Sequence, residues 1–358
     1  MADLKRSALF ELHGAMEAKM APVAGWAMPL QYPGGSISEV SHTLEHCSLF
    51  DFSHSGKLRV AGSSAAAALD SLLLYGTEDL PELGCRQDLL IGGDGLIIAD
   101  LTVCRMAAGD FFLLTNPVNT AAAAAGLQKY LPPETVTDLT QELAIFDLLG
   151  PATPEVTEFL EIPPEQLPEK GRLQIVSIDG VNIILCRTEN SAGADGYRFI
   201  FRRDHAVDLW EMILEYPSVD PAGFNAAEIL RLEAGYPISL RMITPGATPV
   251  EAGFIDSVEE LDDRLKGKAA LQQAVPRFRT VMAETDGRNT VYGGTRICDG
   301  NGKDMGEVLT GVYSPISNRS IAICRLNGSE AAAGDTPLFF EKDGKSIAGR
   351  RINTVFLK

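Results

Sequence analysis

The chain has 358 residues, of which 45% are hydrophobic and 22% charged, a globular composition in a chain too long for one core. Its 48 acidic and 31 basic side chains give a net charge of −17, which argues against nucleic acid and anionic lipid as partners. No stretch approaches the roughly 18 apolar residues of a membrane span, and the first residues lack the apolar run of a secretory signal. We therefore expect a cytoplasmic protein.

The first predicted elements form an α+β unit in the order strand, helix, three strands, helix. The strands are predicted at residues 56–62, 87–93, 95–105 and 111–116, and the helices at 65–74 and 121–131. Ser63 or Ser64 is placed to cap the first helix, and Asn119 or Thr120 to cap the second. A Gly-Asp-Gly turn joins the second and third strands as a hairpin.

The same order of elements recurs further along the chain. The strands are predicted at residues 142–150, 173–178, 181–187 and 196–201, and the helices at 154–160 and 205–214. Thr153 is expected to cap the first of these helices, with Pro154 at its first position. We interpret the recurrence as two similar α+β units, each with helices on one face of an antiparallel sheet.

The tail from about residue 277 reads as short strands separated by Gly, Asn and Asp turns. They are predicted at residues 278–284, 290–298, 320–326, 337–345 and 350–357, after a connection at 265–276. This pattern is typical of a small β-barrel or sandwich.

Two motifs suggest metal or thiol chemistry. HTLEH, residues 42–46, fits the H-x-x-E-H metallopeptidase pattern, but only His54 and His205 follow it as further ligands, so we favour a surface helix. The six cysteines form no C-x-x-C pair, and several lie in apolar strands, which predicts buried thiols in a reducing cytosol.

Three polar residues stand in settings that need an explanation. Asp100 interrupts the apolar strand GLIIADLTV, so it either faces water at a strand edge or works as an acid in a pocket. Arg231, in ILRLEAG, either pairs internally with Glu233 or Glu228 or contacts a ligand. The segment FDFSHSG, which contains Ser55, is consistent with turn chemistry alone.

Taken in order, these segments resemble the aminomethyltransferase family, the T-protein of the glycine cleavage system. LFDFSHSGKLRVAG resembles the family's LFDVSHMGKIRVxG, GGDGLIIADLTVCR its GGIIDDLIV, and FLLTNPVN its LVVNAAN. ILRLEAG and TPVEAGF resemble SLRLEAG and TPVEAGL, and LKGKAAL resembles FIGKEAL. The matches run from about residue 13 to residue 330, nearly the whole chain.

The resemblance implies an α+β fold, a three-domain cloverleaf with tetrahydrofolate in its central channel. A folate-binding region, residues 1–270, would contain two intertwined ferredoxin-like α+β units, roughly 1–135 and 136–270. A distorted β-barrel, residues 277–358, would follow.

The resemblance also assigns roles to residues. Asp100 matches the family's acid that faces the folate N10 and assists transfer, Asn116 the asparagine near the pterin, and Arg231 the arginine at the folate site. Four positions depart from the family pattern, two of them, Ser191 and Ala194, at positions that flank the pterin. Gln87 and Ser191 replace tyrosines, Ala194 replaces a glutamate, and Ser55 replaces a methionine.

The implied function is tetrahydrofolate-dependent one-carbon transfer. In an aminomethyltransferase the donor would be an aminomethyl-lipoyl arm on a carrier protein, with release of ammonia. The departures keep two alternatives open: a tetrahydrofolate-dependent demethylase of a small methylated compound, and a folate-binding protein without transferase activity. An iron–sulfur maturation factor is disfavoured, because LKGKAALQQ lacks the cysteine of that branch.

Overall fold

The computed structural model describes residues 4–187, 195–234, 246–287, 289–328 and 337–352. The chain separates into two compact units by its internal contacts. The first comprises Met1–Leu90, Ile98–Asn190 and Ala194–Glu228, and the second comprises Ile91–Ile97, Ser191–Gly193 and Ile229–Lys358. All six cysteines are buried and unbridged, as the sequence predicted.

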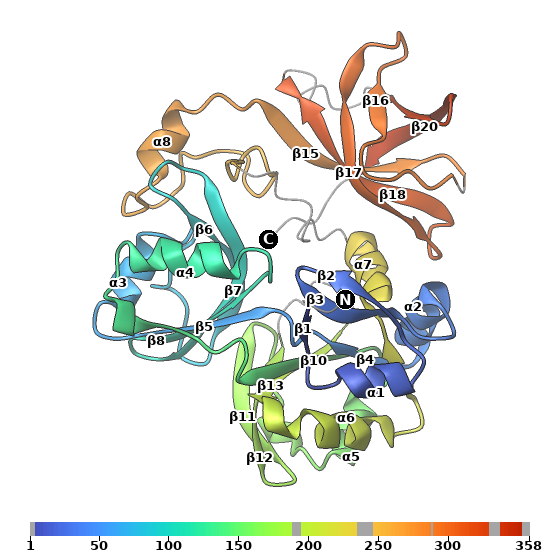
Figure 1. Ribbon diagram of the computed structural model, residues 1–358. Coiled ribbons are helices and arrows are strands. Elements are labelled where there is room, and N and C mark those ends of the chain that lie inside the picture. The colour runs from blue at the N-terminus through green and yellow to red at the C-terminus, as the bar shows by residue number, and fades with distance from the viewer. Residues whose placement is uncertain (1–3, 188–194, 235–245, 288, 329–336, 353–358) are drawn as a thin grey trace. The chain divides into compact units, whose positions relative to one another are not determined.

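A five-stranded sheet in the order β6-β7-β8-β5-β9 carries the first predicted α+β pattern. Its strands are β5 (Gly56–Ala61), β6 (Cys85–Ile91), β7 (Ile97–Ala107), β8 (Asp110–Thr115) and β9 (Val136–Asp138). Helices α3 (Ala65–Asp70) and α4 (Thr120–Gln128) cover one face (Figure 1), where apolar side chains of β5, β7 and β8 are buried. Helix α3 ends before the predicted residue 74, because Leu74 donates its N–H to Leu89 O (3.0 Å) and the segment pairs with β6.

A six-stranded sheet in the order β11-β12-β13-β10-β4-β14 carries the second pattern. Its strands are β4 (Cys47–Asp51), β10 (Leu143–Leu149), β11 (Arg172–Ile178), β12 (Val181–Arg187), β13 (Gly196–Arg202) and β14 (Val219–Ala222). Helices α5 (Thr153–Phe159) and α6 (Ala206–Leu214) pack on it around Phe146 and Trp210. The predicted cap was wrong by one residue: Thr153 is the first helical residue, and its hydroxyl donates to Gly150 O (2.6 Å).

The N-terminal residues add a small sheet and two helices that the sequence patterns did not resolve. The elements are β1 (Lys5–Arg6), α1 (Phe10–Ala15), β2 (Lys19–Val23), β3 (Trp26–Gln31) and α2 (Ser36–Glu45). Short 3-10 helices, η1 (Pro133–Thr135), η2 (Pro164–Gln166) and η3 (Arg203–His205), and helix α7 (Phe224–Glu233) complete the α/β part. Within the described residues, every helix is too short or too polar to cross a lipid bilayer.

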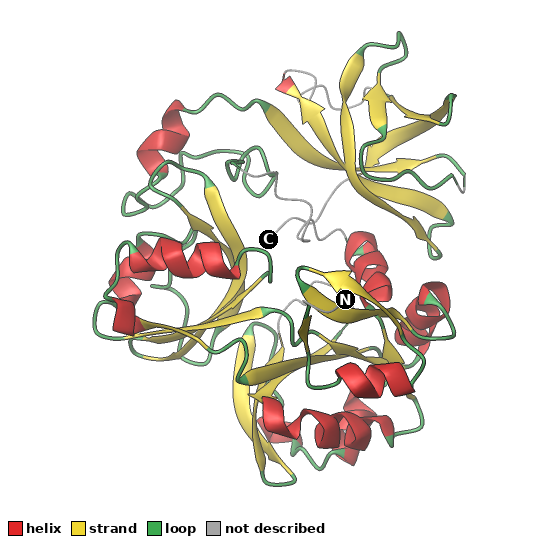
Figure 2. Cartoon of the chain, viewed as in Figure 1, coloured by secondary structure: helices red, strands yellow, loops and turns green. Residues whose placement is uncertain are grey.

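The C-terminal strands close into a six-stranded barrel in the order β15-β18-β17-β16-β19-β20 (Figure 2), as the sequence predicted. Helix α8 (Lys268–Gln273) precedes β15 (Phe278–Thr285), β16 (Arg296–Cys298), β17 (Asp304–Ser314), β18 (Arg319–Asn327), β19 (Leu338–Lys342) and β20 (Lys345–Ile352). Strand β17 was missed because glycines interrupt its pattern. Gly306 has a φ of +146° and no room for a Cβ, which would lie 1.9 Å from Arg325 O.

Candidate functional site

Asp100 lies on an interior strand of the five-stranded sheet. Its strand, β7, has β6 on one side and β8 on the other, so the alternative of a water-facing strand edge was wrong. Its neighbours Ala99 and Leu101 belong to the core under α3 and α4, and side chains alternate along a strand, so Asp100 points to the opposite face. Asp100 is 4% exposed. A carboxylate buried to this degree needs hydrogen-bond donors.

One donor comes from the residue that begins helix α4. The Nδ2 amide of Asn119 donates to Asp100 Oδ1 at 3.1 Å. The sequence predicted Asn119 as a possible helix cap, and it is the N-cap residue, but its side chain makes no capping hydrogen bond. The contact with Asp100 was missed. The signal lay in the β7–β8 hairpin, whose register brings the residues after Thr115 beside Asp100.

Asn116 lies next to Asp100 through its backbone. Its N–H donates to Asp100 O at 3.5 Å, just beyond the paired residues Leu101 and Thr115. Its side-chain oxygen accepts the N–H of Val118 at 3.4 Å, within the turn before α4. Asn116 is half-buried, so its amide remains at the border of the site.

Ser55 lies at the same end of the sheet. Gly56, which follows it, pairs with Thr115, so Asp100, Asn116 and Ser55 occupy one end of three neighbouring strands. A Cβ on Gly56 would lie 2.1 Å from Thr120 Oγ1 and 2.2 Å from Thr115 Oγ1. Thr115 and Thr120, on either side of the turn between β8 and α4, therefore pack directly against the backbone of Gly56.

The segment around Ser55 is more than a turn, because buried polar groups anchor it. Lys57 is buried, and its Nζ donates to the carbonyls of Ser53, Thr140 and Leu143 at 2.8, 3.2 and 3.0 Å. Burial lowers the pKa of Lys57 to about 7.

A second buried polar group in this segment is Asp51, which accepts hydrogen bonds from Ser53 N–H and from the His13 ring. Burial raises the pKa of Asp51, but these hydrogen bonds and the charge of His13 bring it down to about 2.

Gln87 lies on β6, the strand beside β7, and is half-buried. The next residue, Asp88, is fully buried and accepts the N–H groups of Leu89 (2.7 Å) and Tyr75 (3.2 Å). Burial raises the pKa of Asp88 to about 7. This part of β6 therefore carries polar groups in an environment that disfavours charge.

The remaining predicted site residues lie in the second unit or outside the described residues. Arg231 is buried on α7 and belongs to the second unit. In the same unit Glu233 accepts a hydrogen bond from the Ser314 hydroxyl at 2.6 Å, and burial raises its pKa. Ser191 and Ala194 lie outside the described residues.

Two other polar features lack the geometry of a site. His42 contacts Ser48 Oγ at 3.3 Å and Asp220 at 3.2 Å, but Ser48 is fully buried and out of reach of a substrate. The HTLEH segment lies on α2 with His46 exposed, which confirms the predicted surface helix. Among the described residues, no three His, Cys, Asp or Glu side chains are arranged to hold a metal ion.

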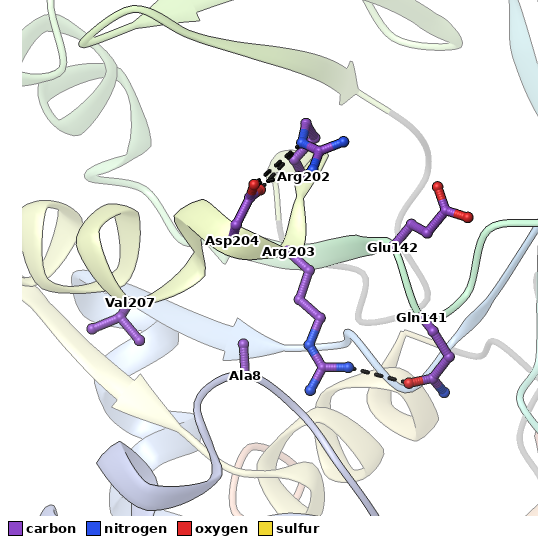
Figure 3. Close-up of a pocket in the computed structure, with 7 residues that line it drawn as sticks. All are labelled: Ala8, Gln141, Glu142, Arg202, Arg203, Asp204 and Val207. Carbon is purple, nitrogen blue, oxygen red and sulfur yellow. Dashed lines mark hydrogen bonds and ion pairs between the residues drawn. The ribbon is translucent and has the colours of Figure 1, made fainter.

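A surface pocket of about 460 Å³ lies between the start of β10 and the corner of β13 and α6 (Figure 3). Its lining residues are Ala8, Gln141, Glu142, Arg202, Arg203, Asp204 and Val207. Both arginines are already engaged, Arg202 with Asp204 (3.1 Å) and Arg203 with Gln141 (3.1 Å). The pocket contains none of the predicted site residues.

Comparisons with known proteins bear on the whole chain. The model of the GCVT N-terminal domain matches residues 9–259, and that of the glycine cleavage T-protein C-terminal barrel domain matches residues 277–358. The aminomethyltransferase of Staphylococcus haemolyticus is 28% identical over 93% of this chain and 93% of its own length. That of Staphylococcus epidermidis is 29% identical over 91% of each chain.

A solved structure gives the same result. The crystal structure of glycine cleavage system aminomethyltransferase T from Bartonella henselae superposes with a TM-score of 0.87 and 28% sequence identity. It covers 99% of this chain and 98% of that one. The chain therefore belongs to the glycine cleavage T-protein family and is an aminomethyltransferase-like one-carbon transferase.

Proposed function

We propose that this protein transfers a one-carbon unit to tetrahydrofolate with Asp100 as its catalytic acid–base. The observation that carries the proposal is a carboxylate only 4% exposed, held by the Asn119 amide on an interior strand of a sheet. Carboxylates move protons in catalysis when burial and hydrogen bonds fix their position and charge. Family membership along the whole chain supplies the reaction class.

In this proposal tetrahydrofolate is a substrate that the residues around Asp100 orient. Their donor set fits a pterin, which needs hydrogen-bond partners of both kinds: a carboxylate on β7, an amide at Asn116 and a second amide at Gln87. Ser55 and Arg231 are proposed as further contacts, together with Ser191 and Ala194. Asp100 would orient or protonate the amine or the leaving group while the one-carbon unit moves to N10 or N5.

The proposed donor is an aminomethyl-lipoyl arm on a carrier protein, in a cytoplasmic setting. The net charge of −17 disfavours nucleic acid as a partner. Full-length similarity to aminomethyltransferases favours this donor over a small methylated compound.

The test compares the wild type with Asp100→Asn. Tetrahydrofolate is titrated anaerobically by calorimetry, and methylene-tetrahydrofolate formation from an aminomethyl-lipoyl carrier is followed in parallel. We expect both proteins to bind tetrahydrofolate and the variant to lose about 10²- to 10⁴-fold in kcat. Asp110→Asn, the same change at the surface end of β8, serves as the control and should remain active.

Each other outcome contradicts a part of the proposal. A wild type that binds tetrahydrofolate but transfers only from a small methylated compound would support the demethylase instead. Binding without any transfer would support the folate-binding alternative. Absence of tetrahydrofolate binding at high micromolar concentration would show that Gln87, Ser191 and Ala194 have changed the ligand.

A further inference from the structure

Helix α4 begins with an asparagine that does not cap it. An N-cap asparagine normally accepts the N–H of the second or third helical residue through its side-chain oxygen. Asn119 occupies the N-cap position of a nine-residue helix but makes no such hydrogen bond. Its Nδ2 donates instead to Asp100 Oδ1 at 3.1 Å. The side chain thus forgoes the usual helix contact and serves a carboxylate on another element.

The backbone around Asn119 is fixed on both sides. Its N–H donates to Asn116 O at 2.9 Å, and its own carbonyl accepts the N–H of Ala123 at 2.8 Å. The Thr120 hydroxyl donates to Asn116 O at 3.3 Å and bonds the Thr115 hydroxyl at 2.9 Å. A side chain on so constrained a turn holds its partner in one orientation.

The chemistry of the contact suits a group that must change its charge. An asparagine Nδ2 can only donate, so it favours the ionised carboxylate without adding a positive charge. The N-terminal end of a helix, where Asn119 lies, also favours a nearby negative charge. The Asn119 contact therefore holds the Asp100 carboxylate without adding a charge of its own.

We propose that Asn119 is a positioning residue of the transfer reaction, which fixes the orientation and the charge state of Asp100. This inference rests on the proposed role of Asp100 in the chemistry. The turn between β8 and α4 would then have a function beyond helix capping and packing, namely to position Asp100.

Three variants separate positioning from helix capping. Asn119→Asp keeps the shape of the side chain but replaces the donor by a second carboxylate. Asn119→Ala removes the contact. Ser64→Ala is the matched control, because Ser64 is the N-cap of α3 on the same sheet, is exposed and likewise makes no capping hydrogen bond.

The first readout is independent of activity. The titration of Asp100 is followed by ¹³C NMR of aspartate carboxyl carbons, with the signal assigned by its loss in Asp100→Asn. We expect the Asp100 midpoint in Asn119→Asp to rise by about one to three pH units, because two carboxylates would share one site. Asn119→Ala should shift it in the same direction by less, and Ser64→Ala should leave it unchanged.

The second readout is the pH profile of transfer. In Asn119→Ala we expect kcat to fall about 10- to 100-fold with little change in KM for tetrahydrofolate, since misplacing a catalytic group affects the chemical step. The acid limb in Asn119→Asp should move to higher pH. An Asp100 titration that is the same in the wild type and Asn119→Asp overturns the inference. A wild type without tetrahydrofolate-dependent transfer instead overturns the proposed function, so the two failures are distinguishable.

Discussion

Two buried aspartates in the first unit receive different kinds of hydrogen-bond donor. Asp100 on β7 receives the neutral amide of Asn119 on one oxygen. Asp147 on β10 receives the Arg198 guanidinium on both: Nε donates to Oδ1 and Nη2 to Oδ2, each at 2.7 Å. The side chains of Asp147 and Arg198 are 2% and 13% exposed.

The difference separates a structural carboxylate from a candidate catalytic one. A two-pronged ion pair fixes both oxygens and ties the negative charge to a permanent cation, so proton exchange would break the pair. The Asn119 amide helps to fix the position of Asp100 without adding a permanent positive charge. Burial alone therefore does not identify a working acid, and the donor that meets the carboxylate is the more informative feature.

The largest effect is expected from breaking the structural pair. Asp147→Ala leaves Arg198 buried without its partner, which should lower the free energy of unfolding by about 3–5 kcal/mol. Urea denaturation followed by circular dichroism measures this change. Asp100→Asn should be milder in the same assay, because an amide can still meet Asn119.

The control for that prediction removes both charges together. Asp147→Leu combined with Arg198→Met leaves no unpaired charge, and it should recover most of the lost stability. A single Asp147→Ala variant that unfolds with the wild-type midpoint would contradict the assignment of this pair to stability.

The next largest effect on the free energy of unfolding is expected from His54, a buried titratable side chain. Its Nδ1 has no hydrogen-bond partner among the described residues. Burial lowers its pKa from 6.5 to about 4, with Asp51 opposing the shift and Lys57 and Arg198 adding to it. Between these values the unfolded chain binds more protons, so stability rises with pH. His54 should therefore contribute a loss of about 3 kcal/mol on acidification from pH 7 to 4, whereas Asp88, whose pKa burial raises to about 7, contributes in the opposite direction.

Thermal or urea unfolding across pH 4–7 measures this loss. His54→Phe is the matched variant, because the ring lies between Phe52 and Phe224 at centroid distances of 6.0 Å and an apolar ring preserves those contacts. On acidification from pH 7 to 4, the unfolding free energy of the wild type should fall relative to that of the variant by about 3 kcal/mol. An equal slope in the variant would assign the acid sensitivity to other groups.

The sequence was sufficient to identify the candidate acid, Asp100, but not the side chain that forms a hydrogen bond with it. The periodicity of β7 singled out Asp100, because a carboxylate between Ala99 and Leu101 breaks an apolar strand. The position of Asn119 at the start of α4 was also predicted from the sequence. Its orientation was not, because a capping asparagine and one that turns to a neighbouring strand have the same local sequence. Only the β7–β8 register decides between them.

The elements of the fold that depend on local sequence were predicted correctly, whereas those that depend on distant groups were not. Both α+β patterns and the barrel were predicted from periodicity and turn residues. The errors arose where a distant group acts: Gly150 O takes the Thr153 hydroxyl, and Arg325 O excludes a side chain at Gly306. The roles of Gln87, Arg231 and Ser55 stay predictions, as do those of Ser191 and Ala194.

A smaller effect on stability is expected from a substitution of Gly56, which the turn between β8 and α4 contacts closely. In Gly56→Ala the new methyl group would overlap the hydroxyls of Thr115 and Thr120, which must then shift. Such overpacking typically lowers stability by about 1–3 kcal/mol, and the displaced turn should carry Asn119 away from Asp100. Transfer should therefore fall even at temperatures where the variant is fully folded.

The control for Gly56 is another glycine with open space around it. Gly180, in the β11–β12 turn, meets no atom within 4 Å, but its φ of +76° strains any side chain. Gly180→Asn, a residue that tolerates this conformation, should leave both stability and transfer near the wild-type values. A Gly56→Ala variant with full activity would show that the turn absorbs the methyl group without moving Asn119.

The smallest effect tests whether fork geometry or burial gives the Asp147 pair its strength. Arg59 and Asp110 form the same arrangement across β5 and β8, with Nε to Oδ1 at 2.9 Å and Nη2 to Oδ2 at 2.8 Å, but their side chains are 48% and 26% exposed. Water and salt screen such a pair, so Arg59→Met should change the unfolding free energy by only about 0–1 kcal/mol. A double-mutant cycle with Asp110→Asn isolates the pairwise part. A coupling as large as that of Asp147 with Arg198 would show that geometry is sufficient, whereas the predicted small coupling makes burial the decisive difference.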